Sequence, residues 1–328
     1  MKKLIYIEKD VKNRLRVKNI IKRFKDPTLI YIDKYTEVFN KRNQNFVIQK
    51  NNPAIILARK YGNLLLKTPK NYSIGRENNY YFSYMYNCIY DCRYCFLQGL
   101  YSSSNLVIFV NYDDFLNEIK VLDNSKIAKK TTIFSGYDCD SMAYDSVTNF
   151  SESLIKKSNE FKNIELEIRT KSTYIKPLMK KSIKNLVIAF SFTPQRFSSK
   201  YELGVANLKK RIVLLKNLVS KGWMIGIRLD PFVIYHGWEN DYIELFELLF
   251  KTIPSNQLHS VTYGNIRFPK NIFVNMKKKY PNEKLFLKFL NKKNNIYDEG
   301  NGEKIKRFCE NYLFNFVSKS KVFCNIHG

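Results

Sequence analysis

The chain has 328 residues and a net charge of +27 at neutral pH, from 56 basic and 29 acidic side chains. This length is ordinary for a single α/β barrel, and no apolar run approaches the roughly eighteen residues needed to cross a membrane. Six cysteines are too few for a disulfide scaffold, and Glu8, Lys9 and Asp10 interrupt the first apolar residues, so no signal peptide is indicated. We therefore expect a cytoplasmic protein in a reducing compartment, with no membrane partner.

The positive charge is concentrated toward the two ends of the chain. Residues 1–79 carry 19 basic and 6 acidic side chains, and residues 266–328 carry 14 and 5. Uniform compositional drift, the alternative explanation, would not leave the centre nearly neutral. The distribution favours a polyanionic partner, DNA or another nucleic acid.

Before Tyr80 the chain predicts strands at Leu4–Ile7 and Leu29–Ile32 and a basic helix near Val11–Phe24. From Tyr80 onward, short apolar runs alternate with longer amphipathic stretches, a pattern typical of βα units and a parallel sheet. Six units fall short of a closed eight-fold barrel, so we expect an α/β fold with an open, partial (β/α)6 barrel of the TIM type. The predicted strands are Tyr80–Tyr86, Thr131–Ser135, Ile164–Arg169, Leu186–Phe192, Trp223–Leu229 and Val261–Ile266. The predicted helices are Tyr112–Leu122, Val147–Phe161, Tyr174–Lys181, Gly204–Ser220, Asp241–Thr252 and Asn271–Lys279.

The end of the chain is polar and rich in turn residues. Residues 280–303 predict a short hairpin or a loop, and a last helix is expected at Glu303–Val317. The expected organisation is a basic N-terminal segment packing on the barrel (1–79), the barrel (80–279) and a C-terminal extension of hairpin and helix (280–328).

Polar residues gather where the predicted strands end, which in α/β barrels is the end that carries the chemistry. Arg228 could pair with Asp230, Asp140 or a phosphate, and the sequence alone does not choose among them. The polar groups are Tyr137–Ser141 after the second strand, Thr170 and Lys171 after the third, Ser191 and Thr193 on the fourth, and Arg228–Pro231 on the fifth.

A C-x3-C-x2-C run, formed by Cys88, Cys92 and Cys95, is the most informative motif. Three thiolates at this spacing can ligate three irons of a 4Fe-4S cluster and leave the fourth iron open. The chemistry that uses such a vacancy is radical generation from S-adenosylmethionine (SAM), whose amino and carboxylate groups chelate the open iron. A structural zinc site is the alternative, but it normally closes with four ligands, and no second short-spaced pair is present. Its fourth ligand would have to be Cys139, Cys309, Cys324 or a histidine.

Several segments, in order between about residues 50 and 280, resemble the spore photoproduct lyase family of radical SAM proteins. They are the cysteine stretch ending in Cys95-Phe-Leu-Gln98, then Ile108-Phe-Val-Asn-Tyr-Asp-Asp114, Arg169-Thr-Lys171, Phe190-Ser-Phe192 and Tyr235-His-Gly-Trp-Glu239. The resemblance implies a partial (β/α)6 radical SAM barrel, a 4Fe-4S cluster, SAM, and a lyase that reverses a thymine-dimer lesion in DNA. It also implies an electron donor such as a flavodoxin or ferredoxin.

By position, the resemblance implies roles for individual residues. Lys171 and Ser191 are expected to contact SAM, with Ser141 as a further possible contact. Tyr94 is expected to be the first of two assisting tyrosines, and Cys139 to be the cysteine that returns a hydrogen atom to the lesion. An alternative for Cys139 is a small buried hydrophobe.

One departure from the family pattern concerns the second assisting tyrosine, which is Phe96 here. Phe96 and the short 280–303 segment favour a second possible function. In this alternative the chain is a radical SAM enzyme that acts on a peptide, a tRNA or a metabolite. A third function, from another class, is a non-catalytic protein that binds zinc and nucleic acid.

Overall fold

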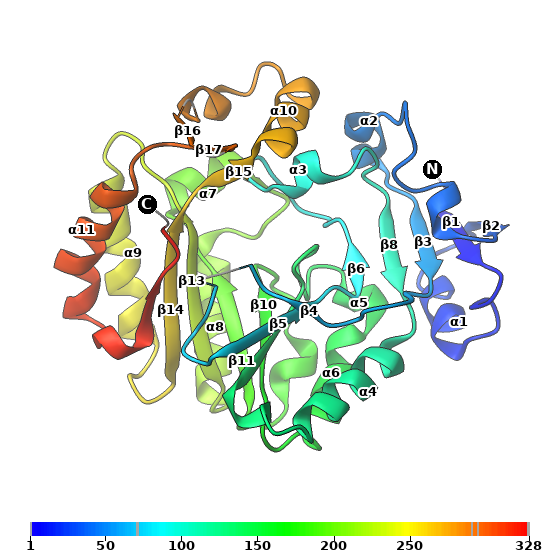
Figure 1. The fold of residues 1–328 in the computed structure, drawn as a ribbon, viewed down its shortest axis with the longest axis horizontal. Coiled ribbons are helices and arrows are strands. Elements are labelled where there is room, and N and C mark those ends of the chain that lie inside the picture. Colours follow the sequence, from blue (N-terminus) through cyan, green and yellow to red (C-terminus); the bar gives the residue numbers. More distant parts are fainter. Residues whose placement is uncertain (1, 70–71, 290, 294, 327–328) are drawn as a thin grey trace.

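Parallel strands that lie side by side in one curled sheet build a half-barrel (Figure 1). The computed structural model describes residues 2–69, 72–289, 291–293 and 295–326. Each barrel strand pairs in parallel with the next, and short strands extend both edges. The predicted partial (β/α)6 barrel is therefore confirmed. Within these ranges the barrel strands in spatial order are β5 (Asn78–Phe82), β9 (Thr131–Ser135), β10 (Glu165–Thr170), β11 (Leu186–Ser191), β13 (Met224–Phe232) and β14 (Leu258–Asn265), and the edge strands are β4 (Leu66–Lys67) and β18 (Val322–Cys324).

Helices cover the outer face of this sheet (Figure 1). Strands covered in this way read as continuous apolar runs, and β11 is buried at every position. In α9 the side chains of Tyr242, Phe246 and Leu249 are buried at helical spacing. The covering helices are α4 (Tyr112–Asp123), α5 (Asp145–Thr148), α6 (Phe150–Ser158), α8 (Leu208–Ser220), α9 (Trp238–Thr252) and α11 (Gly302–Tyr312).

Two predicted helices differ from the structure. The segment expected at 147–161 is divided into α5 and α6 by Asn149, whose φ of 49° is left-handed. The helix expected at 174–181 is only a short 3-10 turn, which has Pro177 in its first turn. The 3-10 turns of the described chain are η1 (Tyr35–Glu37), η2 (Ala128–Lys130), η3 (Lys176–Met179), η4 (Lys284–Lys288), η5 (Leu313–Asn315) and η6 (Lys319–Lys321).

A second sheet holds the N-terminal part of the chain. Its strands β1, β3 and β8 pair in parallel, while β6 pairs antiparallel with β8. The expected strand 80–86 is therefore divided between two sheets, and the expected boundary between residues 79 and 80 lies inside β5. In spatial order the strands are β2 (Thr28–Ile32), β1 (Leu4–Glu8), β3 (Ile55–Ala58), β8 (Leu106–Phe109) and β6 (Met85–Tyr86), and the helices of this region are α1 (Leu15–Ile21) and α2 (Phe46–Asn51).

The C-terminal extension forms the hairpin allowed by its sequence. Strands β16 (Asn291–Lys293) and β17 (Ile296–Asp298) are antiparallel, and β15 (Arg267–Pro269) joins them. Helix α10 (Lys270–Lys279) packs against α3 (Leu97–Leu100), the helix that directly follows Cys95. A Cβ on Gly99 would lie 2.2 Å from the carbonyl oxygen of Ile272, so this close approach requires glycine.

In the part of the chain that the structure describes, no helix is both long enough and apolar enough to cross a bilayer.

Candidate active site

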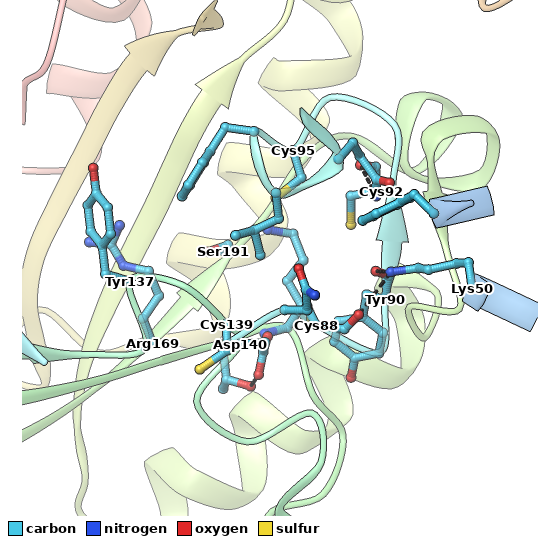
Figure 2. A pocket seen from close by; sticks show the side chains of 18 residues that line it. Lys50, Cys88, Tyr90, Cys92, Cys95, Tyr137, Cys139, Asp140, Arg169 and Ser191 are labelled. Atoms are coloured by element: carbon cyan, nitrogen blue, oxygen red, sulfur yellow. Dashed lines mark hydrogen bonds between the residues drawn. The ribbon is translucent and has the colours of Figure 1, made fainter. Parts of the chain in front are cut away.

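Three cysteines from one loop line a single cavity at the carboxyl ends of the barrel strands (Figure 2). Cys88, Cys92 and Cys95 lie between β6 and α3, and each has a free thiol. The middle of this loop is fixed by β7 (Asp91–Cys92), which pairs antiparallel with β12 (Glu202–Leu203) after α7 (Gln195–Tyr201). The structure therefore brings together the residues that the spacing predicts as iron ligands.

Lys50, from α2 in the N-terminal region, supports the cysteine loop. Its Nζ donates hydrogen bonds to the carbonyl oxygens of Cys88 at 2.9 Å and Tyr90 at 3.0 Å, and it lines the same cavity. The sequence carried no signal for this role, because Lys50 lies 38 residues before Cys88 and only tertiary packing joins them.

Loops after β9 and β10 form the opposite wall, and Asp140 ties them together. Its carboxylate accepts hydrogen bonds from the Thr170 hydroxyl and from the backbone N–H of Lys171, both at 2.6 Å. It also accepts from the backbone N–H groups of Met142 and Ala143. Asp140 therefore positions both loops, a role that the sequence did not suggest.

The charge of Lys171 acts on the cysteine loop. Burial raises the pKa of Cys92 and Cys95, and the nearby Lys171 ammonium opposes this rise at both thiols. Iron ligands must be thiolates, so a cation beside the loop favours the form that binds metal.

The donor set fits a 4Fe-4S cluster better than a zinc ion. A cubane places its three thiolates on three different irons, so the sulfur atoms need not converge on one point. A zinc site does need such convergence. Among the described residues, no group of three or more histidine, cysteine, aspartate or glutamate side chains could hold a single metal ion.

Cys139 lines the same cavity as the three loop cysteines and is only 6% exposed. Burial, followed by the neighbouring Cys88 and Asp138, raises the pKa of the Cys139 thiol well above its usual value. The side chain is therefore an S–H group at neutral pH, the form from which a hydrogen atom could be transferred. Cys139 also belongs to the hydrophobic core, as the alternative of a small buried hydrophobe predicts, so its role as hydrogen donor stays a prediction.

The residues expected to contact SAM differ in placement. Lys171 and Ser191 line the cavity. Ser141 is not among the lining residues, because its hydroxyl points to Ser135 at 2.7 Å and its backbone N–H donates to the carbonyl oxygen of Arg169. Ser141 is fully buried and lies behind the wall, so its contact with SAM stays a prediction.

Tyr94 also lies behind the wall, where it belongs to a buried polar cluster. Its hydroxyl donates to the carboxylate of Glu202, which also accepts from Thr193, Ser198 and Arg211. Burial alone would raise the pKa of Glu202, but the charges of Lys171 and Arg211 outweigh it and lower that pKa. Glu202 is therefore a carboxylate that fixes Tyr94, and neither Glu202 nor Arg211 was anticipated from the sequence.

Replacing Arg211 with methionine is expected to destabilise the fold by about 3–5 kcal/mol, because it leaves the buried Glu202 charge without its ion-pair partner. Urea unfolding measures the change. Arg196→Met, which removes an exposed ion pair with Asp241, is the matched control and should change stability little. Equal unfolding curves for Arg211→Met and the unmodified chain would contradict the role of this pair.

A half-barrel of parallel strands with a three-cysteine loop at the carboxyl ends of its strands defines a radical SAM enzyme. Comparison with known proteins narrows this class. The family model described as spore photoproduct lyase matches residues 1–323, so the chain belongs to the spore photoproduct lyase family. The family resemblance expected from the sequence is thereby confirmed.

Two similar proteins of known function are also spore photoproduct lyases. The spore photoproduct lyase of Bacillus subtilis (strain 168) is 24% identical over 269 residues, which cover 78% of this chain and 79% of the relative. The enzyme of Geobacillus sp. (strain Y412MC61) is 24% identical over 208 residues, covering 61% and 60%.

Solved structures show the same fold. A spore photoproduct lyase variant with serine in place of a cysteine superposes with a TM-score of 0.81 at 17% identity, covering 100% of this chain and 99% of that one. Another variant, with bound AdoMet and dinucleoside spore photoproduct, also gives 0.81, at 18% identity over 99% and 98%.

Proposed function

We propose that this chain is a radical SAM lyase that repairs spore photoproduct, a thymine-dimer lesion, in DNA. The observation that carries the proposal is one cavity lined both by the three cysteines of the cluster motif and by the protonated thiol of Cys139. The relative that binds AdoMet and dinucleoside spore photoproduct supports the substrate.

In this proposal each residue has a defined task. Cys88, Cys92 and Cys95 hold the 4Fe-4S cluster, and Lys171 and Ser191 bind SAM as a charged and a neutral hydrogen-bond donor. When bound, the cluster and SAM would supply the radical chemistry that removes a hydrogen atom from the lesion. Cys139 would give the hydrogen atom of its S–H to the opened product radical and be left as a thiyl radical. That thiyl radical would recover a hydrogen atom from 5′-deoxyadenosine, which restores the S–H group for the next turnover. Tyr94 assists from its fixed position beside Glu202.

The basic ends of the chain suit a nucleic-acid substrate, because they meet beside the cysteine loop. Helix α2 contributes Phe46 and Lys50 to the cavity wall, and Lys279 of α10 lies with its Nζ 3.9 Å from the centre of the Phe46 ring. Figure 1 shows α2, α3 and α10 on one side of the molecule. A flavodoxin or ferredoxin in the cytoplasm would supply the electron.

Repair is tested by incubating the anaerobically reconstituted chain with reductant, SAM and an oligonucleotide that contains the photoproduct. Restored thymine is the expected result. Release of 5′-deoxyadenosine without thymine would favour a different substrate, and a colourless protein with one zinc would contradict the whole class.

The alternative of a non-DNA substrate within the same family has one observation in its favour. Phe96 lines the cavity at the position where the resemblance places a tyrosine, so that phenol group is missing. Tyr137, also on the cavity wall, has its ring 5.7 Å from that of Phe96 and brings another phenol close to this position.

Binding to a lesion-containing duplex is expected to weaken steeply with salt. Each phosphate that the protein neutralises should lower the logarithm of the affinity by about 0.9 per log unit of salt. Fluorescence anisotropy between low and physiological salt measures the slope, and a dinucleoside lesion, which has no phosphate, is the control with a flat response. A shallow slope for the duplex would count against DNA as the partner.

A further inference from the structure

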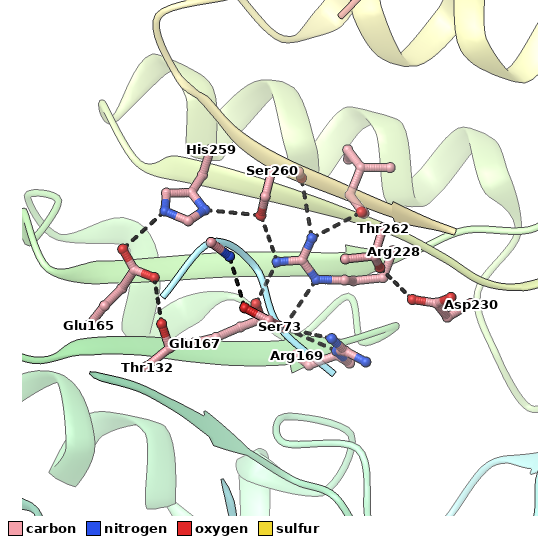
Figure 3. Close-up of polar contacts among 12 residues, drawn as sticks. Ser73, Thr132, Glu165, Glu167, Arg169, Arg228, Asp230, His259, Ser260 and Thr262 are labelled. Carbon is pink, nitrogen blue, oxygen red and sulfur yellow. Dashed lines mark hydrogen bonds and ion pairs between the residues drawn. The ribbon is translucent and has the colours of Figure 1, made fainter. Parts of the chain in front are cut away.

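A charged network of buried residues adjoins Arg169, which lines the cavity (Figure 3). Glu167 on β10 and Arg228 on β13 are fully buried ion-pair partners, with Nε of Arg228 at 3.2 Å from Oε1 of Glu167. Arg228 also donates to the hydroxyl of Ser260 on β14. Its partner is therefore Glu167 and not Asp230, Asp140 or a phosphate, the three that the sequence left open.

Arg169 shares the same carboxylate. Its Nε and Nη2 lie 3.1 and 3.0 Å from Oε1 of Glu167, and Nη2 also contacts the hydroxyl of Tyr72. One carboxylate thus serves two guanidinium groups. Asp230, the other nearby carboxylate, hydrogen-bonds with Thr262 and Asn325 and makes no ion pair with Arg169 in the described chain.

The remaining edge of Arg169 is available to a ligand. The side chain is 26% exposed and lines the cavity, and no hydrogen bond of Nη1 is present within the described ranges. Burial, followed by the charge of Arg228, lowers the pKa of Arg169 to about 9, so it remains a cation at neutral pH. Nη1 therefore keeps its donor capacity for an acceptor on a ligand.

The position of Arg169 indicates which of the two ligands of the proposed reaction, SAM or the lesion, it contacts. The Nζ of Lys171 lies 5.9 Å from the centre of the Tyr94 ring, and Tyr94 stands between Cys92 and Cys95 in the chain. This places the Lys171 charge at the cysteine end of the cavity, where SAM would bind. Arg169 is instead bonded to Glu167, the carboxylate that also pairs with the buried Arg228. In the proposed reaction Cys139 gives a hydrogen atom to a thymine base of the lesion. Because Cys139 lines this cavity, the linked bases must enter it.

We propose that Arg169 recognises the lesion directly, by donating hydrogen bonds from Nη1 to carbonyl oxygens of the linked thymine bases. Enzymes that act on an extruded base read its edge through such donors. A neutral carbonyl suits a guanidinium whose charge Glu167 already offsets in part. This inference rests on the proposed function. It names Arg169 as the residue by which the enzyme would recognise the linked thymine bases.

The test measures binding to the reconstituted holoenzyme with SAM and without reductant, so that no repair occurs. Arg169→Met is expected to bind the dinucleoside lesion about 10- to 100-fold more weakly, as for loss of a hydrogen bond from a charged donor. The same loss is expected for the dinucleotide lesion that retains its bridging phosphate. Arg169→Lys should fall between, because it keeps the charge and loses the planar fork.

Each other outcome has a defined meaning. A loss confined to the dinucleotide would assign Arg169 to the phosphate, and a loss confined to SAM affinity would assign it to the cofactor carboxylate. Weaker binding of both the lesion and SAM, together with a lower melting temperature, would indicate that Arg169 has only a structural role. All three outcomes overturn the proposal. Arg23→Met, at an exposed position after α1, is the matched control and should change neither affinity.

Failure of this inference is distinguishable from failure of the proposed function. If the unmodified chain repairs the lesion and Arg169→Met binds it equally well, only the inference fails. If the unmodified chain binds neither lesion, the proposed function fails and the inference with it.

Discussion

Replacing Cys92 with alanine is expected to abolish both the cluster and all SAM cleavage. Cys92 is buried at the centre of the loop, where the pairing of its strand β7 with β12 holds its backbone in place. Two thiolates cannot hold a cubane that needs three protein ligands. Iron should fall from about four atoms per chain to near zero, with loss of the brown colour and of 5′-deoxyadenosine formation.

Cys324→Ala is the matched control, because Cys324 is exposed on the edge strand β18. This variant should keep its iron and its rate of SAM cleavage. Retention of visible absorption and SAM cleavage by Cys92→Ala would mean that other residues ligate the cluster.

The cysteine ligands could be predicted from the sequence because their chemistry depends on local spacing. Cys88, Cys92 and Cys95 lie within eight residues, and a loop of that length brings them together in almost any fold. The barrel strands were predictable for a similar reason. Their apolar runs are long and alternate regularly with helices. Strand β9 therefore matches its predicted bounds, β11 ends one residue early, and β10 is shifted by one residue at both ends.

Residues that support the site could not be predicted, because their contacts depend on register and packing. Glu167 and Arg228 meet across β11, although the register aligns Glu167 with Val187 and Arg228 with Ser191 on that strand. Their pairing therefore depends on how the two long side chains pack. Lys50 and Glu202 reach the cysteine loop from distant segments. The short strands β3 and β8 were also missed, because apolar runs of four residues do not distinguish a strand from a helix.

Replacing Cys139 with alanine is expected to separate lesion consumption from repair. The cysteines of the cluster motif and Lys171 are unchanged, so SAM cleavage and attack on the lesion should continue. The cavity wall then lacks its S–H group, and the opened product radical must be quenched by other donors. Chromatography of the products should show lesion loss at a comparable rate, with restored thymine reduced to a minor product.

A solvent isotope experiment tests the same step in the unmodified chain. A thiol hydrogen exchanges with water, so repair in D2O should place deuterium in the restored thymine if Cys139 is the donor. Cys309→Ala removes an equally buried thiol from α11 and should leave both products and deuterium incorporation unchanged. Unaltered products from Cys139→Ala would remove Cys139 from the mechanism, and the buried thiol would then be only a packing residue of the cavity wall.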